Sequence, residues 1–503
     1  MKEVISLRDS RQAALSRHPF FEWLNADCVA IEERLKFAPM GAFFIMQFRD
    51  MNRWVLRFPQ ARDEFEWIIN LGTREDERHS RMFLDDWHKL NINECLRWQA
   101  SDMLWWLFLS PDQEIFRRSG IEFISLAVED GNDALVRFGH SEAGEAAGHV
   151  FLSNTAKVAV LLAAQTGLNY CYFGPYHLDL ESGHVANTEG VFEEAVLDPG
   201  RRAHSKDLCA RMFDLFEQIF DGFLHYANTY VDTKTIPQRP AEPTRVRAGW
   251  TAPPLEIKPA DQRDIDVLQK LVQRKTQVAA HPFYDWLRED DGLSAAQKLK
   301  RFIPMWVIDI LGYRDLNKYA MTYANPQDCA QRAINTWARR LSAHSSLFLS
   351  DWDALELDEL FGYSASETLE FLFLDRDMDT HREHMIEFAK LALRYREPAL
   401  RWWMMAALES TGEQFFAHTQ PLALAVEKET GARLDYLSGR HDAPAAGTNT
   451  GAEVDGVPPA RLSAQQHDIA LTLVDVVFDS MEDQLWRSLA VARANKFGVA
   501  EKQ

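Results

Sequence analysis

The stretch His18–Leu24, which reads HPFFEWL, recurs later in the chain as His281–Leu287, which reads HPFYDWL. Further pairs of matching segments follow at a nearly constant offset of about 264 residues. The pairs are Phe48–Trp54 and Tyr313–Tyr319, His79–Trp87 and His344–Trp352, Glu145–Phe151 and Glu409–Phe415, and Thr166–Gly167 and Thr430–Gly431. Self-similarity at one offset over this length indicates that the chain contains two copies of one domain.

The region between the two copies is rich in proline. We expect a first domain over residues 1–235, a linker over 236–262 and a second domain over 263–503. The linker prolines are Pro237, Pro240, Pro243, Pro253, Pro254 and Pro259. Proline cannot continue a helix and favours extended backbone, which is typical of a linker. A second stretch, 442–463, is rich in Ala, Gly, Pro and Thr and is predicted to be a loop inside the second domain.

Hydrophobic periodicity indicates helices in both copies. Apolar residues recur at three- and four-residue steps in 26–54, 207–224 and 468–489, which is the period of an amphipathic helix. Alternating strand patterns and Asn-Gly hairpin signals are absent from the sequence. Each copy is therefore predicted to be an all-α bundle of about seven helices.

Composition narrows the class of protein. The 503 residues are 46% apolar and 26% charged, as in globular proteins, and the net charge of −20 disfavours nucleic acid and anionic membranes as partners. The five cysteines are scattered and odd in number, which is typical of reduced thiols in the cytosol. The N-terminal segment lacks the apolar core of a signal peptide, and no apolar run reaches the ~18 residues of a membrane helix. We expect a soluble, cytoplasmic protein.

Three clusters in the first copy carry residue types that bind metals. In the first cluster Glu75 precedes His79 by four residues, so both project from one face of a helix, and Asp76 and Glu77 compete for the same role. The second cluster is Glu145, on a predicted helix of small residues. Imidazole and carboxylate groups without a nearby thiolate suit iron or manganese better than structural zinc.

The third cluster is a stripe of His177, Glu181 and His184 at positions i, i+4 and i+7 of one predicted helix. A single Glu and His pair on a helix is more often a surface ion pair, and a lone glutamate is more often structural. Three such clusters on three predicted helices together favour a metal site over these simpler interpretations.

The second copy provides an internal comparison. The residues equivalent to His79, Glu145 and His177 are His344, Glu409 and His441. The residues equivalent to Glu75, Asp76, Glu181 and His184 are Arg340, Leu341, Ala445 and Thr448, which cannot replace them as ligands. We therefore expect one complete site in the first copy and a degenerate one in the second. The competing interpretation is that the retained residues are hydrogen-bonding groups of a shared core.

His18 and His281 raise a different hypothesis, because a histidine in the first helix could bind haem. Each is followed directly by proline and then by aromatic residues. Proline is favoured in the first turn of a helix, so these two histidines are predicted to mark helix starts instead. Their presence in both copies supports this structural role.

The combination of motifs resembles the haem-oxygenase-like dimetal (di-iron) oxidase family. The segment His177–His184 is similar to the His-x-x-x-Asp/Glu-x-x-His motif of the last core helix in that family. Glu145 resembles the glutamate of its central helix, and Glu75 with His79 resembles the pair on an earlier helix. The resemblance implies two tandem haem-oxygenase-like seven-helix bundles, with the full set of metal ligands in the first alone.

The resemblance also implies a chemistry. Two Fe(II) ions in the first domain would react with O2 as co-substrate and oxidise a small-molecule metabolite by N-oxygenation, oxidative decarboxylation or C–C cleavage. The sequence does not distinguish between iron and manganese as the bound metal. The alternative is a cofactor-free ligand-binding protein or a non-catalytic scaffold of the same fold. The second copy would complete an intramolecular pseudo-dimer, and further oligomerisation stays open. Tyr170, Tyr172, Trp105 and Trp106 are candidates for pocket or core positions.

Overall fold

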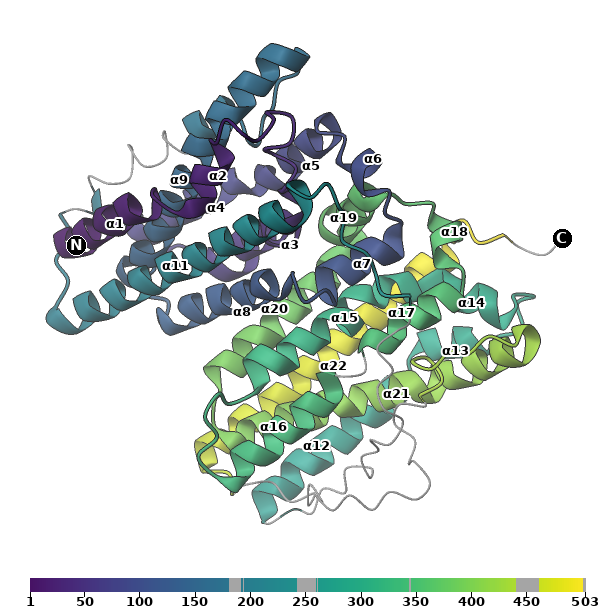
Figure 1. Cartoon of the computed structure of the whole chain (residues 1–503). Coiled ribbons are helices and arrows are strands. Elements are labelled where there is room, and N and C mark those ends of the chain that lie inside the picture. Colours follow the sequence, from purple (N-terminus) through teal and green to yellow (C-terminus); the bar gives the residue numbers. More distant parts are fainter. Residues whose placement is uncertain are drawn as a thin grey trace. The chain divides into compact units, whose positions relative to one another are not determined.

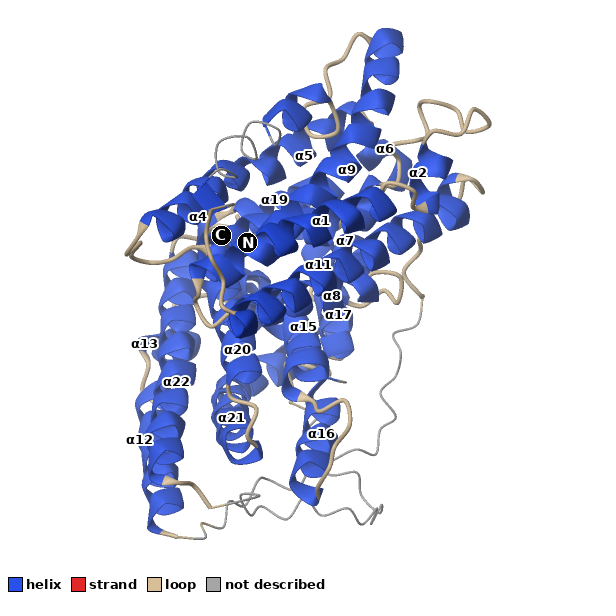
Figure 2. Ribbon diagram, turned by 90° about the vertical axis from the view of Figure 1, so that its left-hand side faces the viewer, coloured by secondary structure: helices blue, strands red, loops and turns tan. Residues whose placement is uncertain are grey.

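A computed structural model of the chain describes residues 1–180, 191–192, 194–241, 259, 261–342, 345–439 and 461–500. These residues form helices joined by turns and loops, and they contain no strand beyond one isolated bridge between Gln99 and Ser364 (Figure 2). The prediction of an all-α chain is confirmed.

Contacts between residues divide the chain into two compact units. Unit 1 contains Met1–Arg239 and the segment Tyr363–Phe373, and unit 2 contains Pro240–Gly362 and Leu374–Gln503. Most of helix α19 (Ala365–Leu374) therefore belongs to unit 1, although it lies in the second half of the sequence. The side-chain amide of Asn93 donates to the Ser366 hydroxyl at 2.8 Å, and the ring centroids of Phe43 and Phe373 lie 6.1 Å apart.

Unit 1 is built around two long helices. Helix α9 packs against α11, and α11 in turn packs against α1 and α8 (Figure 1). Besides α19, its helices are α1 (Lys2–Leu15), α2 (Pro19–Leu24), α3 (Ala38–Asp50), α4 (Glu64–Glu75), α5 (His79–Lys89), α6 (Ile92–Leu96), α7 (Ala100–Phe108), α8 (Glu114–Glu129), α9 (Ala134–Thr166) and α11 (Pro199–Tyr226). A π-helix, η1 (Met51–Leu56), follows α3, a 3-10 turn, η2 (Asp76–Arg78), separates α4 from α5, and a second π-helix, η3 (Ala227–Val231), follows α11.

The helices of unit 2 follow a similar order, with α14 added and with no helix in the place of α7, whose counterpart in the sequence is α19. They are α12 (Gln262–Ala279), α13 (Pro282–Arg288), α14 (Ala295–Phe302), α15 (Val307–Asp315), α16 (Cys329–Ser342), α17 (Ser345–Ala354), α18 (Leu357–Phe361), α20 (Asp379–Arg394), α21 (Pro398–Thr430) and α22 (Ala464–Arg493). Details of the longest helices recur as well. Helices α9 and α21 both have 33 residues, and both end at a glycine with a positive φ, Gly167 at 73° and Gly431 at 76°. A π-helix, η5 (Leu316–Met321), follows α15 as η1 follows α3.

His18 and His281 begin equivalent short helices. The Nδ1 atom of His18 accepts a hydrogen bond from the backbone N–H of Phe20 at 3.2 Å, and that of His281 accepts one from Phe283 at 3.1 Å. A side-chain acceptor at this position satisfies an N–H group that the helix itself leaves unpaired. The prediction that these histidines mark helix starts is confirmed.

Two features of the fold differ from the sequence-based expectation. The helix expected over 26–54 begins at Ala38, and residues before it form turns. Pro39 explains this start, because proline is tolerated in the first turn of a helix but breaks a helix that runs through it. Unit 1 also has more helical segments than the seven or so that the sequence predicts. Two of these segments, α2 and α6, are short, with six and five residues, and the 3-10 turn η2 separates α4 from α5.

Among the described residues, α9 is the one helix that is long and apolar enough to cross a membrane by length and composition. Of its most apolar window, 56% is buried inside the structure. The core helix of a soluble protein has the same properties, so this helix is weak evidence for a membrane span.

Candidate metal centre

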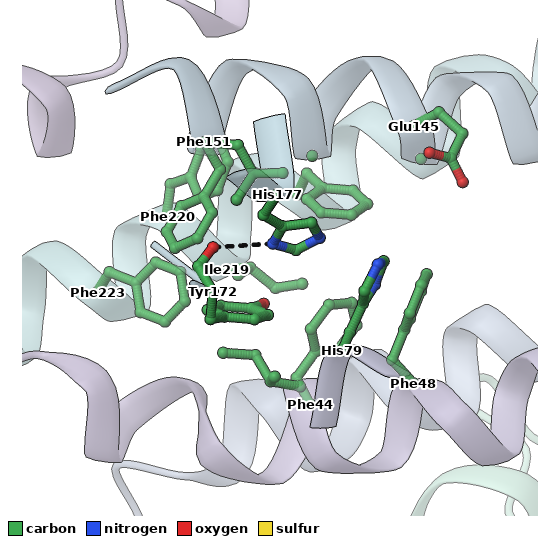
Figure 3. Close-up of a pocket in the computed structure, with 15 residues that line it drawn as sticks. Phe44, Phe48, His79, Glu145, Phe151, Tyr172, His177, Ile219, Phe220 and Phe223 are labelled. Atoms are coloured by element: carbon green, nitrogen blue, oxygen red, sulfur yellow. Dashed lines mark hydrogen bonds between the residues drawn. The ribbon is translucent and has the colours of Figure 1, made fainter. Parts of the chain in front are cut away.

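A cavity of about 90 Å³ in unit 1 brings together His79, Glu145 and His177 (Figure 3). These are one residue from each of the three clusters that the sequence singles out. The cavity is lined by Phe44, Ile45, Phe48, His79, Gly144, Glu145, Gly148, Phe151, Leu152, Tyr172, His177, Phe216, Ile219, Phe220 and Phe223. Segments that are far apart in the sequence therefore meet at one site.

Helix α9 supplies one wall of the cavity. Glu145, Gly148 and Leu152 are spaced by three and four residues, so they share a face of the helix. A Cβ atom placed on Gly148 would meet no other atom within 4 Å. Because this glycine adds no side chain, the space on this face of α9 stays open.

His79 is the first residue of α5, directly after the 3-10 turn η2. It is buried, with 7% of its surface exposed. The hydroxyl of the next residue, Ser80, donates to the carbonyl of Met46 at 3.2 Å and ties the start of α5 to α3. This contact holds His79 against the helix that carries Phe44 and Phe48.

The 3-10 turn changes which acidic residue lies near His79. Helix α4 ends at Glu75, so the single helix face predicted for Glu75 and His79 is interrupted. Side chains three residues apart are aligned in a 3-10 turn, and the Oδ1 atom of Asp76 lies 3.9 Å from the Nε2 atom of His79. Glu77 instead accepts a hydrogen bond from Arg57 at 2.6 Å. The side chain of Glu75 lies outside the described structure.

His177 lies in a short helical segment, 175–180. Its Nδ1 atom is 2.8 Å from the Tyr172 carbonyl, so Nδ1 carries the proton and Nε2 is the acceptor nitrogen. Burial lowers the pKa of His177 to about 4, which keeps the imidazole neutral at neutral pH. Its ring centroid lies 4.1 Å from that of His79. A neutral imidazole with an oriented N–H is the form that binds a metal ion.

A buried carboxylate positions the loop before His177. Asp86 accepts hydrogen bonds from three consecutive backbone N–H groups, those of Cys171 and Tyr172 at 2.8 Å and of Phe173 at 3.0 Å. Burial raises the pKa of Asp86, and the three N–H donors act in the opposite direction. These bonds fix the Tyr172 carbonyl, which in turn orients the His177 ring.

The remaining predicted ligands cannot be placed. Glu181 and His184 lie outside the described residues. Within the described part of the chain, no group of three His, Cys, Asp or Glu side chains is arranged to hold a metal ion. The donors that do line the cavity, two imidazoles and a carboxylate, are a nitrogen and oxygen set that fits Fe(II) or Mn(II).

The equivalent region of unit 2 contains an ion pair. Arg340, which corresponds to Glu75, donates to the carboxylate of Glu409, which corresponds to Glu145, at 2.8 Å. Asp351, which corresponds to Asp86, accepts hydrogen bonds from the backbone N–H groups of Tyr436 and Leu437. The equivalents of the other candidate ligands, His344, His441, Ala445 and Thr448, lie outside the described residues, and Leu341 is the last-but-one residue of α16.

The aromatic candidates separate into pocket and core. Tyr172 lines the cavity, whereas Tyr170 and Trp106 are buried away from it and Trp106 donates its indole N–H to the Pro39 carbonyl at 2.9 Å. Trp105 is also absent from the lining. Sequence reasoning missed the phenylalanine walls and the role of Asp86. The recurrence of Asp86-Trp87 as Asp351-Trp352 in the second copy was the available signal for the role of Asp86.

No protein-family model matches the chain, and comparison with the curated proteins gives no significant match. A functional assignment therefore depends on the residues of the cavity and on their chemistry.

Proposed function

We propose that unit 1 is a non-haem di-iron, O2-dependent oxidase or oxygenase that acts on a small-molecule metabolite, and that each unit has the haem-oxygenase-like fold. The observation that carries this proposal is that His79, Glu145 and His177 line one cavity. The acidic charge of −20 and five free cysteines support a cytoplasmic protein without nucleic-acid or membrane partners.

The residues that would hold the metal are those of the three clusters. The full proposed set is Glu75, His79, Glu145, His177, Glu181 and His184, with the buried Asp76 as an alternative or additional carboxylate beside His79. Two ferrous ions held in this way would supply the electrons that reduce dioxygen. The protein contributes a neutral, oriented imidazole at His177 and largely apolar walls around it.

Anaerobic titration with Fe(II), followed by elemental analysis, tests the proposal. We expect about two irons per chain for the wild type and fewer for Glu145→Ala. The matched control is Glu409→Ala, at the equivalent position of unit 2, which should bind as much iron as the wild type. Circular dichroism of each variant shows whether it is folded.

The other outcomes are informative. Absence of iron binding in the wild type would overturn the oxidase proposal and favour the cofactor-free ligand-binding alternative. About four irons per chain would show that unit 2 also binds metal. This result would contradict the expectation that Arg340 occupies the carboxylate of Glu409 and keeps it from binding metal.

A further inference from the structure

The walls of the unit 1 cavity are apolar outside its polar groups. Apart from His79, Glu145, His177, Tyr172 and two glycines, every lining side chain is aromatic or aliphatic. These side chains are Phe44, Ile45, Phe48, Phe151, Leu152, Phe216, Ile219, Phe220 and Phe223. Within the described part of the chain, no lysine or arginine lines this cavity. The protein therefore offers a bound anion no cationic side chain there.

Three of the phenylalanines lie at the end of the cavity that is away from His79 and Glu145. Figure 3 shows Phe151, Phe220 and Phe223 on one side of His177, with His79 and Glu145 on the other. The three phenylalanine rings contact one another, with centroids 5.6 to 6.2 Å apart. A molecule in this cavity would place one end among the phenyl rings and the other near the imidazoles.

The aromatic end is backed by a second layer of rings. Phe20, from the short helix that His18 begins, lies 5.3 Å from Phe223, and Phe37 lies 5.0 Å from Phe223, measured between ring centroids. Both are fully buried. Because close-packed rings resist displacement, this wall has a defined shape.

The fold itself does not require apolar residues at these positions. Unit 2 carries Asp309, Gln484 and Ser488 where unit 1 carries Phe44, Ile219 and Phe223, and its helices follow a similar order. In unit 2 the Gln484 amide donates to the Asp309 carboxylate at 2.6 Å. Asp309 also pairs with His381, which stands where unit 1 has Phe116. A polar network thus replaces the apolar wall within a similar arrangement of helices.

A second pair of positions also differs between the two units. A Cβ atom on Gly41 would lie only 3.0 Å from the ring of Phe223, so a larger residue there would press against this ring. Unit 2 has Trp306 at the position of Gly41, and its indole N–H donates to Ser488, at the position of Phe223, at 3.0 Å. The Trp306 ring lies 4.7 Å from Phe415, the counterpart of the cavity residue Phe151. The two units have therefore diverged at the positions that shape the cavity.

We propose that the unit 1 cavity takes an uncharged hydrocarbon or aromatic group of the substrate, and that Phe44, Ile219 and Phe223 determine this specificity. A charged group among the phenyl rings would lose its hydration and gain no counter-ion. An apolar group would lose only unfavourable contact with water. The inference deepens the proposed function, on which it rests for the reaction at the polar end, but binding of the apolar group requires no metal.

The test uses the full-length, metal-free protein and benzene, a neutral probe small enough for a cavity of about 90 Å³, with binding followed by isothermal titration calorimetry. We expect saturable binding, and displacement by straight-chain 1-alkanols that strengthens with chain length until the cavity is filled. Displacement by alkanoate ions of equal length, whose carboxylate meets no lysine or arginine in the described lining, should be at least tenfold weaker. Saturation at one probe per chain is expected for a single cavity.

Variants identify the site. Phe44→Asp and Ile219→Gln each introduce the residue that unit 2 has at the equivalent position, and each should weaken probe binding at least tenfold. Ile219→Leu keeps the wall apolar and should retain binding. The matched control in unit 2 is Gln484→Ile, which should leave the affinity unchanged. Circular dichroism shows whether each variant is folded.

The outcomes separate this inference from the proposed function. Absence of probe binding to the wild type, or wild-type affinity in both Phe44→Asp and Ile219→Gln, would overturn the apolar specificity. Loss of probe binding in these variants, in a protein that binds no iron, would support the ligand class while the di-iron proposal fails. Iron binding with no saturable probe binding would support the di-iron proposal and overturn the apolar specificity.

Discussion

The guanidinium of Arg340 lies 2.8 Å from the carboxylate of Glu409, at the two positions whose counterparts in the first half of the chain are Glu75 and Glu145. The side chains of Arg340 and Glu409 are only 11% and 18% exposed. The chain itself therefore supplies the positive charge that neutralises Glu409. In unit 1 the position equivalent to Arg340 holds Glu75, which is acidic and supplies no positive charge to Glu145.

Arg340→Met should lower the free energy of unfolding by about 2 kcal/mol, because it leaves a largely buried carboxylate without its partner. Glu409→Gln in the same chain should recover part of this loss, since the uncompensated charge is removed. Urea unfolding followed by circular dichroism, on the two single variants and the double variant, measures the coupling. Strictly additive effects of the two substitutions would contradict an interaction between these residues.

Asp86→Ala should lower the free energy of unfolding by about 3 kcal/mol, because three backbone N–H groups lose their acceptor. Hydrogen exchange of the amides of Cys171, Tyr172 and Phe173 should accelerate in this variant. The matched variant Asp351→Ala should accelerate the amide of Leu437 instead and leave residues 171–173 protected. Unchanged exchange at 171–173 in Asp86→Ala would show that the carboxylate does not hold this loop.

Asp351 should make the stability of the protein depend on pH. Burial raises the pKa of Asp351 from 3.8 to about 8, so the folded state binds a proton that the unfolded chain releases between these values. The contribution of this group to stability is complete below about pH 4 and is lost as the pH rises to about 8. Asp351→Asn does not titrate, so its free energy of unfolding should fall less steeply from pH 5 to 8. Equal slopes for the variant and the wild type would contradict this assignment.

Trp306 and Ser488 should behave as a coupled pair. Trp306→Gly should cost about 3–5 kcal/mol, because it leaves a cavity in the core of unit 2. Ser488→Phe alone should cost about 1–3 kcal/mol, because the added ring has no room beside the indole. The double variant restores the Gly41 and Phe223 combination of unit 1 and should be more stable than the sum of the single effects implies. Chemical unfolding of all three proteins measures this difference.

Much of the helical structure could be predicted from the sequence. The stripes of apolar residues in 207–224 and 468–489 lie within α11 and α22, because burial of one helix face imposes the 3.6-residue period that the sequence shows. Pro39 also marked the start of α3, although the apolar period before it suggested an earlier one. The break after Glu75 could not be predicted, since no glycine or proline follows Glu75, and the nearby Gly72 lies inside α4.

The site could be anticipated in part. His79, Glu145 and His177 meet at one cavity, as expected for residues that share a function, whereas their role in binding metal stays a proposal. The phenylalanine walls are not evident from spacing alone, because phenylalanines that line a cavity and those that fill a core have the same helical spacing. The contrast between Phe44 and Asp309, or between Ile219 and Gln484, was the available signal for them.

The position of α19 has a consequence for biosynthesis. Unit 1 includes Tyr363–Phe373, so its native contacts, among them those of Asn93 and Phe43, form only after the ribosome has made residue 373. At roughly 5–20 residues per second, this segment is completed about 7–27 seconds after Arg239. During that interval the nascent chain exposes the apolar surface that α19 later covers. Chaperones that bind exposed apolar segments during translation therefore have a defined target in this protein.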